Sequence, residues 1–138
     1  MQILRAEEDF ACALESWPDQ ELVRLLRLRL AFYVDYEEPL SELFKLILIE
    51  PGDTLAGIDS EFDGAFLIND YSGRRYGDPG FKPAFVVLEE YPGFYAMLFC
   101  EGDGGFGIEV IVPKSTDIDP RLLSLCSQYA TLAPPLAP

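Results

Sequence analysis

The fold is decided by residues 84–112, which read AFVVLEEYPGFYAMLFCEGDGGFGIEVIV. Three segments of this stretch are rich in the β-branched and aromatic residues that strands favour: Ala84–Tyr91, Phe94–Glu101 and Phe106–Val112. Pro92-Gly93 separates the first two segments, the glycine-rich residues 102–105 separate the last two, and both connections have hairpin lengths. The pattern predicts a three-stranded antiparallel meander.

Upstream, residues 19–33 (DQELVRLLRLRLAFY) predict a helix. Asp19 and Glu21 would lie in its first turn, where acidic side chains interact favourably with the helix dipole. Its expected apolar face comprises Leu22, Leu25, Leu26, Leu30 and Tyr33. Arg29 falls inside that face and fits it poorly, and residues 27–35 also alternate with the period of a strand. We favour the helix because Leu, Arg and Ala are strong helix formers.

Shorter signals lie between this helix and the meander. Residues 43–50 (LFKLILIE) predict a buried strand that ends at Pro51-Gly52. Asp53 or Thr54 is then expected to cap a short helix that runs through Phe62. Ala65–Ile68 predicts a second short strand.

After the meander, Asp119-Pro120 is typical of a helix start and predicts a last helix, followed by an extended or frayed tail over residues 133–138. The order helix, strand, helix, strand, meander, helix predicts a single α+β domain over residues 1–138. We expect a mostly antiparallel sheet with a C-terminal three-stranded meander and with the helices packed on one face.

The charge of the chain narrows its function. Twenty-four acidic residues oppose ten basic ones, so the net charge is −14, and histidine is absent. Such a field repels nucleic acid and anionic membrane surfaces, so we expect neither as a direct partner. Without histidine the chain lacks the most common proton-transfer group and metal ligand. We therefore expect no enzyme, no cofactor and no metal site.

The cysteines and the N-terminal residues indicate a cytoplasmic location. Cys12, Cys100 and Cys126 are widely spaced, odd in number and without a CxxC motif, so we expect three reduced cysteines that serve packing. Cys100 has no histidine or basic neighbour to activate it, and we expect it to be buried rather than nucleophilic. The first residues turn acidic at once and show no signal-peptide pattern. The apolar runs are too short to span a bilayer.

The loop between Asn69 and Pro83 is the first candidate binding site. Its central residues include Tyr71, Arg74, Arg75, Tyr76 and Asp78, which place two arginines between two tyrosines in an acidic molecule. Tyr and Arg are enriched at interface hot spots, which favours a recognition surface. The alternative interpretation is that the arginines only neutralise nearby Asp70 and Asp78.

The acidic side chains of the meander are the second candidate site. Glu89 and Glu90 are adjacent on a strand and must point to opposite faces, so they are not an acid–base pair with each other. The turn around Asp103 is acidic and glycine-rich but lacks the spacing of a calcium loop, and it is interpreted as a wide hairpin turn. Carboxylates available to hold a basic partner or a cationic ligand are Glu89, Glu101, Asp103 and Glu109.

Three segments of the chain resemble a known group of proteins: Glu50–Leu55 (EPGDTL), Tyr76–Pro83 (YGDPGFKP) and Asp103–Lys114 (DGGFGIEVIVPK). They are similar to segments of small acidic proteins of unassigned function carried by bacterial plasmids and integrative conjugative elements. The similarity spans roughly residues 40–130. It implies a bacterial, cytoplasmic accessory protein and brings no active-site residues with it.

These observations favour a non-enzymatic acidic binding protein that acts on a basic protein partner, such as a nuclease, a defence factor or a toxin. The alternative is a small-molecule binding domain with an aromatic-lined cavity between sheet and helices. Its lining would come from Phe85, Tyr91, Phe94, Tyr95, Phe99 and Phe106. The oligomeric state is left open by the sequence.

Overall fold

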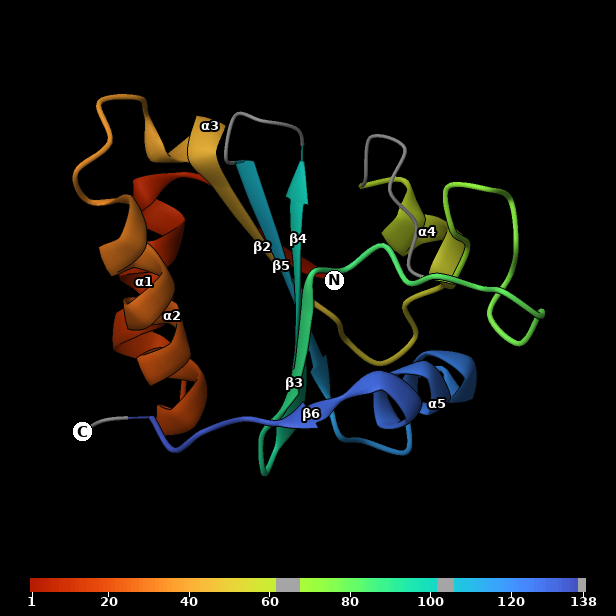
Figure 1. Ribbon diagram of the computed structural model, residues 1–138. Helices are drawn as coiled ribbons and strands as arrows, with labels where there is room; N and C mark the ends of the chain where they lie inside the picture. The colour runs from red at the N-terminus through yellow and green to blue at the C-terminus, as the bar shows by residue number, and fades with distance from the viewer. Residues whose placement is uncertain (62–67, 102–105, 137–138) are drawn as a thin grey trace.

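The computed structural model describes residues 1–61, 68–101 and 106–136, and in them a six-stranded sheet lies between two layers of helices (Figure 1). The strands are β1 (Gln2–Leu4), β2 (Phe44–Leu48), β3 (Val87–Glu90), β4 (Phe94–Glu101), β5 (Phe106–Pro113) and β6 (Thr131–Leu132). Their order across the sheet is β1-β2-β5-β4-β3-β6. The chain is therefore an α+β domain, as its pattern predicts.

The sheet is mixed, which corrects the expectation of a mostly antiparallel sheet that ends in a C-terminal meander. The three predicted segments do pair antiparallel in chain order, as β3 with β4 and β4 with β5. They nevertheless lie inside the sheet, because β2 pairs in parallel with β5 and β6 pairs in parallel with β3. The short strands β1 and β6, of three and two residues, carry too little pattern to be predicted.

The helices cover both faces of the sheet, so the expectation of helices on one face is wrong (Figure 1). On one face lie α1 (Glu7–Ser16) and α2 (Gln20–Tyr33), with the single turn α3 (Leu40–Leu43) at its end; on the other lie α4 (Leu55–Asp59) and α5 (Pro120–Tyr129). The reason is visible in β4, where Phe94 and Ala96 pack towards α2 while Met97 and Phe99 pack towards α5. A strand that is apolar on both faces needs a cover on each.

The helix predicted over residues 19–33 is confirmed as α2, and the alternative strand over residues 27–35 is wrong. The Asp19 side chain caps the helix by accepting hydrogen bonds from the amides of Glu21 and Leu22. Asp119 caps α5 by accepting from the amide of Arg121, with Pro120 in the first turn. Helix α1 was not predicted; its buried side chains are Phe10 and Ala13.

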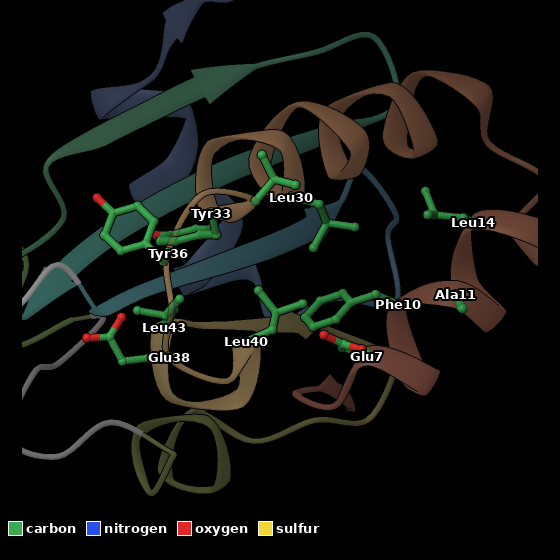
Figure 2. A pocket seen from close by; sticks show the side chains of 11 residues that line it. Glu7, Phe10, Ala11, Leu14, Leu30, Tyr33, Tyr36, Glu38, Leu40 and Leu43 are labelled. Atoms are coloured by element: carbon green, nitrogen blue, oxygen red, sulfur yellow. The ribbon is translucent and has the colours of Figure 1, made fainter.

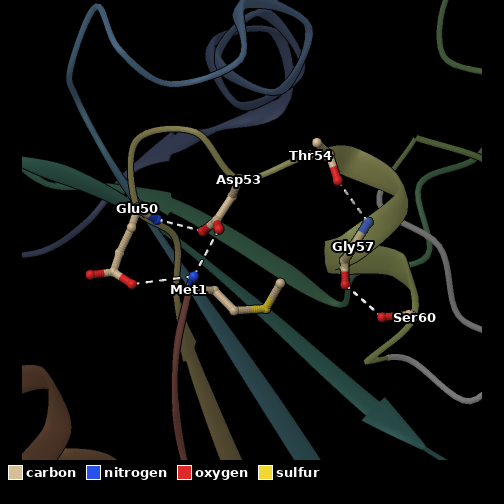
Figure 3. A network of polar contacts seen from close by, with 6 residues as sticks. All are labelled: Met1, Glu50, Asp53, Thr54, Gly57 and Ser60. Atoms are coloured by element: carbon tan, nitrogen blue, oxygen red, sulfur yellow. Dashed lines mark hydrogen bonds and ion pairs between the residues drawn. The ribbon is translucent and has the colours of Figure 1, made fainter.

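The start of the chain is fastened beside α4 (Figure 3). The Met1 ammonium lies 2.7 Å from Asp53 Oδ1 and 3.2 Å from Glu50 Oε1. Asp53 also accepts from the Glu50 amide at 2.7 Å, and Gly52 in the same turn has a φ of +89°, which favours glycine. Of the two expected caps it is Thr54 that caps α4, by accepting from the Gly57 amide.

Two sequence expectations near α4 concern residues beyond those that the structure describes. The helix ends at Asp59, whereas Phe62, its predicted end, lies outside the described residues. Most of the strand predicted over Ala65–Ile68 also lies outside them, and Ile68 itself is not in a strand.

The last described residues connect the two layers of helices. After β6 the Ala133 amide donates to the Glu90 carbonyl at 3.1 Å, and Leu136 packs against the core on the side of α1 and α2. The segment from residue 133 to 136 lies outside the helices and strands and is anchored at these two points. None of the helices formed by the described residues has the length and apolar character needed to cross a membrane.

The three cysteines are free thiols, as expected, but only Cys126 is buried. Burial raises the pKa of the Cys126 thiol to about 12. Cys12 and Cys100 are exposed, which corrects the expectation of three packing cysteines and of a buried Cys100. Cys100 is the last residue but one of β4.

Candidate functional site

A groove opens between α1, the end of α2 and α3, and it encloses about 340 Å³ (Figure 2). Each helix contributes apolar side chains to it: Phe10 and Leu14 from α1, Leu30 and Tyr33 from α2, Leu40 and Leu43 from α3. Two lining residues are charged, Glu7 and Glu38, and both are acidic. The groove therefore combines an apolar interior with a negative rim.

The floor of the groove is fixed to the sheet by stacked rings. Phe10 of α1 and Phe44 of β2 are stacked with their ring centroids 5.7 Å apart. The Tyr33 ring lies 5.4 Å from the same Phe44 ring. All three side chains belong to the core between the sheet and α2, so the floor is rigid before any ligand arrives.

The rim next to the end of α2 exposes large apolar side chains. Phe32 is 66% exposed, Val34 is 74% exposed and Tyr36 is 46% exposed. The Phe32 and Tyr36 rings lie 6.1 Å apart and both contact Tyr33. Acidic residues alternate with them in the sequence FYVDYEE, residues 32–38. That alternation, at the end of a predicted helix, is the signal that could have identified the groove from the sequence.

Beneath α2, the misfit residue Arg29 reaches the buried Glu109 of β5. Arg29 Nε donates to Glu109 Oε1 at 2.5 Å, and Arg29 Nη2 lies 3.8 Å from Glu89 Oε1. Glu109 has no exposed surface, and its other oxygen, Oε2, has no hydrogen-bond partner among the described residues. Arg29 is thus held between two carboxylates that the sequence placed on separate strands.

The protonation of this group is shaped by its burial. Burial raises the pKa of Glu109 to about 7, because removal from water outweighs the attraction of Arg29. For Arg29 burial acts to lower the pKa, but the charge and hydrogen bond of Glu109 outweigh it and the pKa is raised. Both pKa values are raised, which favours the charged form of Arg29 but the neutral form of Glu109; the Arg29 side chain keeps 19% of its surface in water whereas Glu109 keeps none. The loss of hydration at Glu109 is the dominant effect.

On the opposite side of the sheet, the loop between Asn69 and Pro83 is organised by Asp70. The Asp70 carboxylate is buried and accepts hydrogen bonds from the Ser72 hydroxyl at 2.7 Å and from three backbone amides, those of Ser72, Arg74 and Lys82. The Ser72 hydroxyl and these amides lower the pKa of Asp70 to about 2. Asp78 accepts in the same way from the Arg75 amide at 2.9 Å.

The guanidinium groups of the loop are therefore not neutralised by its aspartates. Both Arg74 and Arg75 are exposed, and neither forms an ion pair with a described residue; Arg74 Nη1 donates to the Ser72 hydroxyl at 2.7 Å. Tyr71 is 73% exposed at the tip of the loop. Tyr76 instead turns inward, where its hydroxyl donates to Gln128 Oε1 of α5 at 2.5 Å.

The predicted site residues fall into separate places. Tyr71, Arg74, Arg75, Tyr76 and Asp78 belong to one loop. Glu89 and Glu109 meet at Arg29 on the other side of the sheet. Glu101 ends β4, and Asp103 lies outside the described residues.

The aromatic residues proposed to line one cavity are divided between the two faces of the sheet. Tyr91 and Phe94 pack on the side of α2, whereas Tyr95, Phe99 and Phe85 pack on the side of α5. They cannot surround a common ligand. Within the described parts of the chain, no cluster of three or more His, Cys, Asp or Glu side chains has a metal-binding arrangement.

Comparisons of the chain with protein-family models, with curated proteins and with solved structures gave no match. The resemblance of three segments to proteins of plasmids and conjugative elements therefore stays a prediction.

Proposed function

We propose that this protein binds a basic segment of a partner protein, and that the groove between α1, α2 and α3 is the binding site. One observation carries the proposal: a groove of about 340 Å³ with an apolar and aromatic interior has Glu7 and Glu38 as its charged lining residues. An apolar side chain of the partner would fill the interior, and Lys or Arg side chains would flank it. This deepens the acidic-binding-protein interpretation of the sequence.

The rim is suited to cations for a second reason. Phe32 and Tyr36 are exposed, and the acidic residues Asp35, Glu37 and Glu38 are their neighbours in the sequence. A guanidinium or ammonium group above such a ring gains a cation–π contact of about 0.5–2 kcal/mol. The net charge of −14 would also speed the approach of a basic partner at low ionic strength.

The test uses labelled peptides and fluorescence anisotropy. The probe is a synthetic amphipathic helix of Leu and Lys with one Trp, and its counterpart has Glu in place of every Lys. We expect the basic peptide to bind and the acidic one not to bind, with an affinity that falls at least tenfold between 50 and about 300 mM salt. Equal binding of both peptides would reduce the site to a non-specific apolar surface.

Matched variants locate the site. Tyr36→Ala should weaken peptide binding by tenfold or more, about 1.4 kcal/mol, as expected of an aromatic hot spot. Tyr71→Ala removes an exposed tyrosine from the opposite side of the sheet and should not weaken it. Glu7→Gln with Glu38→Gln should weaken binding, whereas Glu15→Gln with Asp117→Asn, which removes the same charge elsewhere, should not. If either control, Tyr71→Ala or the double variant Glu15→Gln with Asp117→Asn, weakened peptide binding, the binding site would not be the groove.

A further inference from the structure

The loop at Asp70 exposes basic side chains in a molecule that has few basic residues outside ion pairs. Five of the ten basic side chains form ion pairs with carboxylates: Arg24, Arg29, Lys45, Arg121 and Lys114. The other five form none with a described residue, and three of those, Arg74, Arg75 and Lys82, lie in this one loop. Tyr71, 73% exposed, belongs to the same loop.

The conformation of the loop is held by hydrogen bonds within the chain, so it is ordered before any partner binds. Asp70 holds both ends of the tip, since it accepts from the amides of Ser72 and Arg74 on one side and of Lys82 on the other. The backbone adds hydrogen bonds from the Asp70 amide to the Arg74 carbonyl and from the Tyr76 amide to the Ile68 carbonyl. A loop ordered in its free state loses less entropy on binding.

The side chains of the loop are complementary to the lining of the groove. The groove takes an apolar or aromatic side chain flanked by cations, and the loop presents Tyr71 with Arg74 and Arg75. The two surfaces lie on opposite sides of the sheet, so one molecule cannot join its own loop to its own groove (Figure 1). Only a second molecule can bring them together.

Resting on the proposed function of the groove, we propose that the partner of this groove includes a second copy of the chain, whose Tyr71–Arg75 loop docks into it. The contact is head-to-tail: each molecule offers its groove to one neighbour and its loop to another. Such a contact does not close on itself as a two-fold dimer does, and it generates chains or rings. A basic external partner would compete with the loop for the same groove.

The balance of charges sets the strength of this contact. Two molecules of charge −14 repel each other at long range, but at about 0.15 M salt that repulsion is screened beyond about 8 Å. At contact, the guanidinium groups of Arg74 and Arg75 meet Glu7 and Glu38 or the ring of Tyr36. A contact through one loop is small, so we expect weak association that depends on protein concentration.

Sedimentation equilibrium tests the proposal. In about 150 mM salt the weight-average mass of the wild-type chain should rise beyond that of a dimer as its concentration increases towards about 1 mM. Tyr71→Ala with Arg75→Ala disables the loop, and Tyr36→Ala with Glu38→Gln disables the groove. Each double variant alone should stay monomeric. All four positions are exposed, and far-UV circular dichroism verifies that both variants are folded.

Mixing the two variants gives the decisive readout. One retains an intact groove and the other an intact loop, so an equimolar mixture should form a one-to-one dimer and grow no further. The basic peptide used above should dissociate that dimer. A wild-type chain that stays monomeric at about 1 mM overturns the inference, as does association that survives the loop variant. The groove's own function is judged separately by peptide binding, so if the peptide binds to a monomeric chain, only self-association fails.

Discussion

At the scale of single residues, the pair of Arg29 and Glu109 explains two anomalies at once. Arg29 interrupts the apolar face of α2, and Glu109 interrupts the apolar run FGIEVIV of β5. In the sequence the misfit of Arg29 was recognised but that of Glu109 was not; 80 residues separate the two, and nothing local indicates that they meet. The pairing depends on how α2 crosses the sheet. The misfit of Arg29 in the apolar face could be anticipated from the sequence, whereas its pairing with Glu109 could not.

Replacing Glu109 with Gln should change the stability of the fold in a pH-dependent way. Because its pKa rises from 4.5 to about 7 on folding, the carboxyl contributes stability that is fully present below pH 4.5 and is lost as the pH rises through 7. At pH 8 Glu109→Gln should therefore be more stable than wild type by about 1–3 kcal/mol, because each unit of raised pKa corresponds to about 1.4 kcal/mol. The difference should vanish towards pH 4.5. Urea unfolding at each pH measures it.

The control is Glu15→Gln, which neutralises an exposed carboxylate on α1. It should show no comparable dependence on pH. A Glu109→Gln protein that is less stable than wild type at pH 8 would mean that the ion pair with Arg29 outweighs the dehydration of Glu109.

Asp70 is the residue on which the order of the loop depends. Asp70→Ala removes the acceptor for the amides of Ser72, Arg74 and Lys82, so these amides should exchange with solvent faster. Asp78→Ala is the matched control, because its carboxylate accepts from the Arg75 amide alone among the described residues. Amide exchange followed by NMR distinguishes the two variants. Unchanged exchange in Asp70→Ala would show that backbone hydrogen bonds hold the loop without the carboxylate.

At the scale of elements, the sequence predicted those helices and strands that have a clear periodicity or a capping residue. Helices α2 and α5, with Asp19 and Asp119 as caps, and the strands β2 to β5 follow from local pattern. Helix α1 was missed because few of its side chains are buried, and β1 and β6 because they are very short. The parallel pairing of β2 with β5 was missed because it joins segments about 60 residues apart in the chain and leaves no local trace.

The packing of α2 on β5 can be tested at Gly107. A methyl group added there would lie 2.6 Å from the Tyr33 hydroxyl, which is closer than such contacts occur. Gly107→Ala should therefore destabilise the fold by about 1–3 kcal/mol through overpacking. Tyr33→Phe removes the hydroxyl and should recover most of that loss in the double variant. Chemical denaturation of the four proteins gives the coupling.

Additive effects of Gly107→Ala and Tyr33→Phe would mean that the steric clash at Gly107 involves a group other than the Tyr33 hydroxyl. If the double variant lost the sum of the two single losses, Tyr33 would not be the group that fills the space above Gly107. Because the Tyr33 ring also forms the floor of the groove, peptide binding by Tyr33→Phe, which keeps the ring, should be close to wild type.

At the scale of the whole molecule, composition suggested binding and the architecture indicates where. The acidic balance pointed to a basic partner but to no place on the surface, because 24 acidic residues are spread along the chain. The groove exists only where α1, α2 and α3 meet, and α1 was not predicted. The candidate site was therefore out of reach of the sequence, apart from the alternation of aromatic and acidic residues after α2. The candidate loop was within reach, because its residues are contiguous.

The uncompensated charge should itself limit the stability of the fold. Folding brings the carboxylates closer together, and the described ion pairs at the surface, such as Lys114 with Glu90 and Arg121 with Asp119, offset only a few of them. The free energy of unfolding should therefore rise by about 0.5–2 kcal/mol between 10 and about 300 mM NaCl, where screening is the main effect of the salt. Urea unfolding at pH 8 and at low protein concentration, where any self-association is negligible, measures it. Glu8→Gln with Glu15→Gln, both exposed on α1, should flatten that dependence. A free energy of unfolding that falls with added salt would mean that attractive ion pairs outweigh the repulsion between carboxylates. The negative surface would then not destabilise the fold, and no binding role would be needed to explain why it is retained.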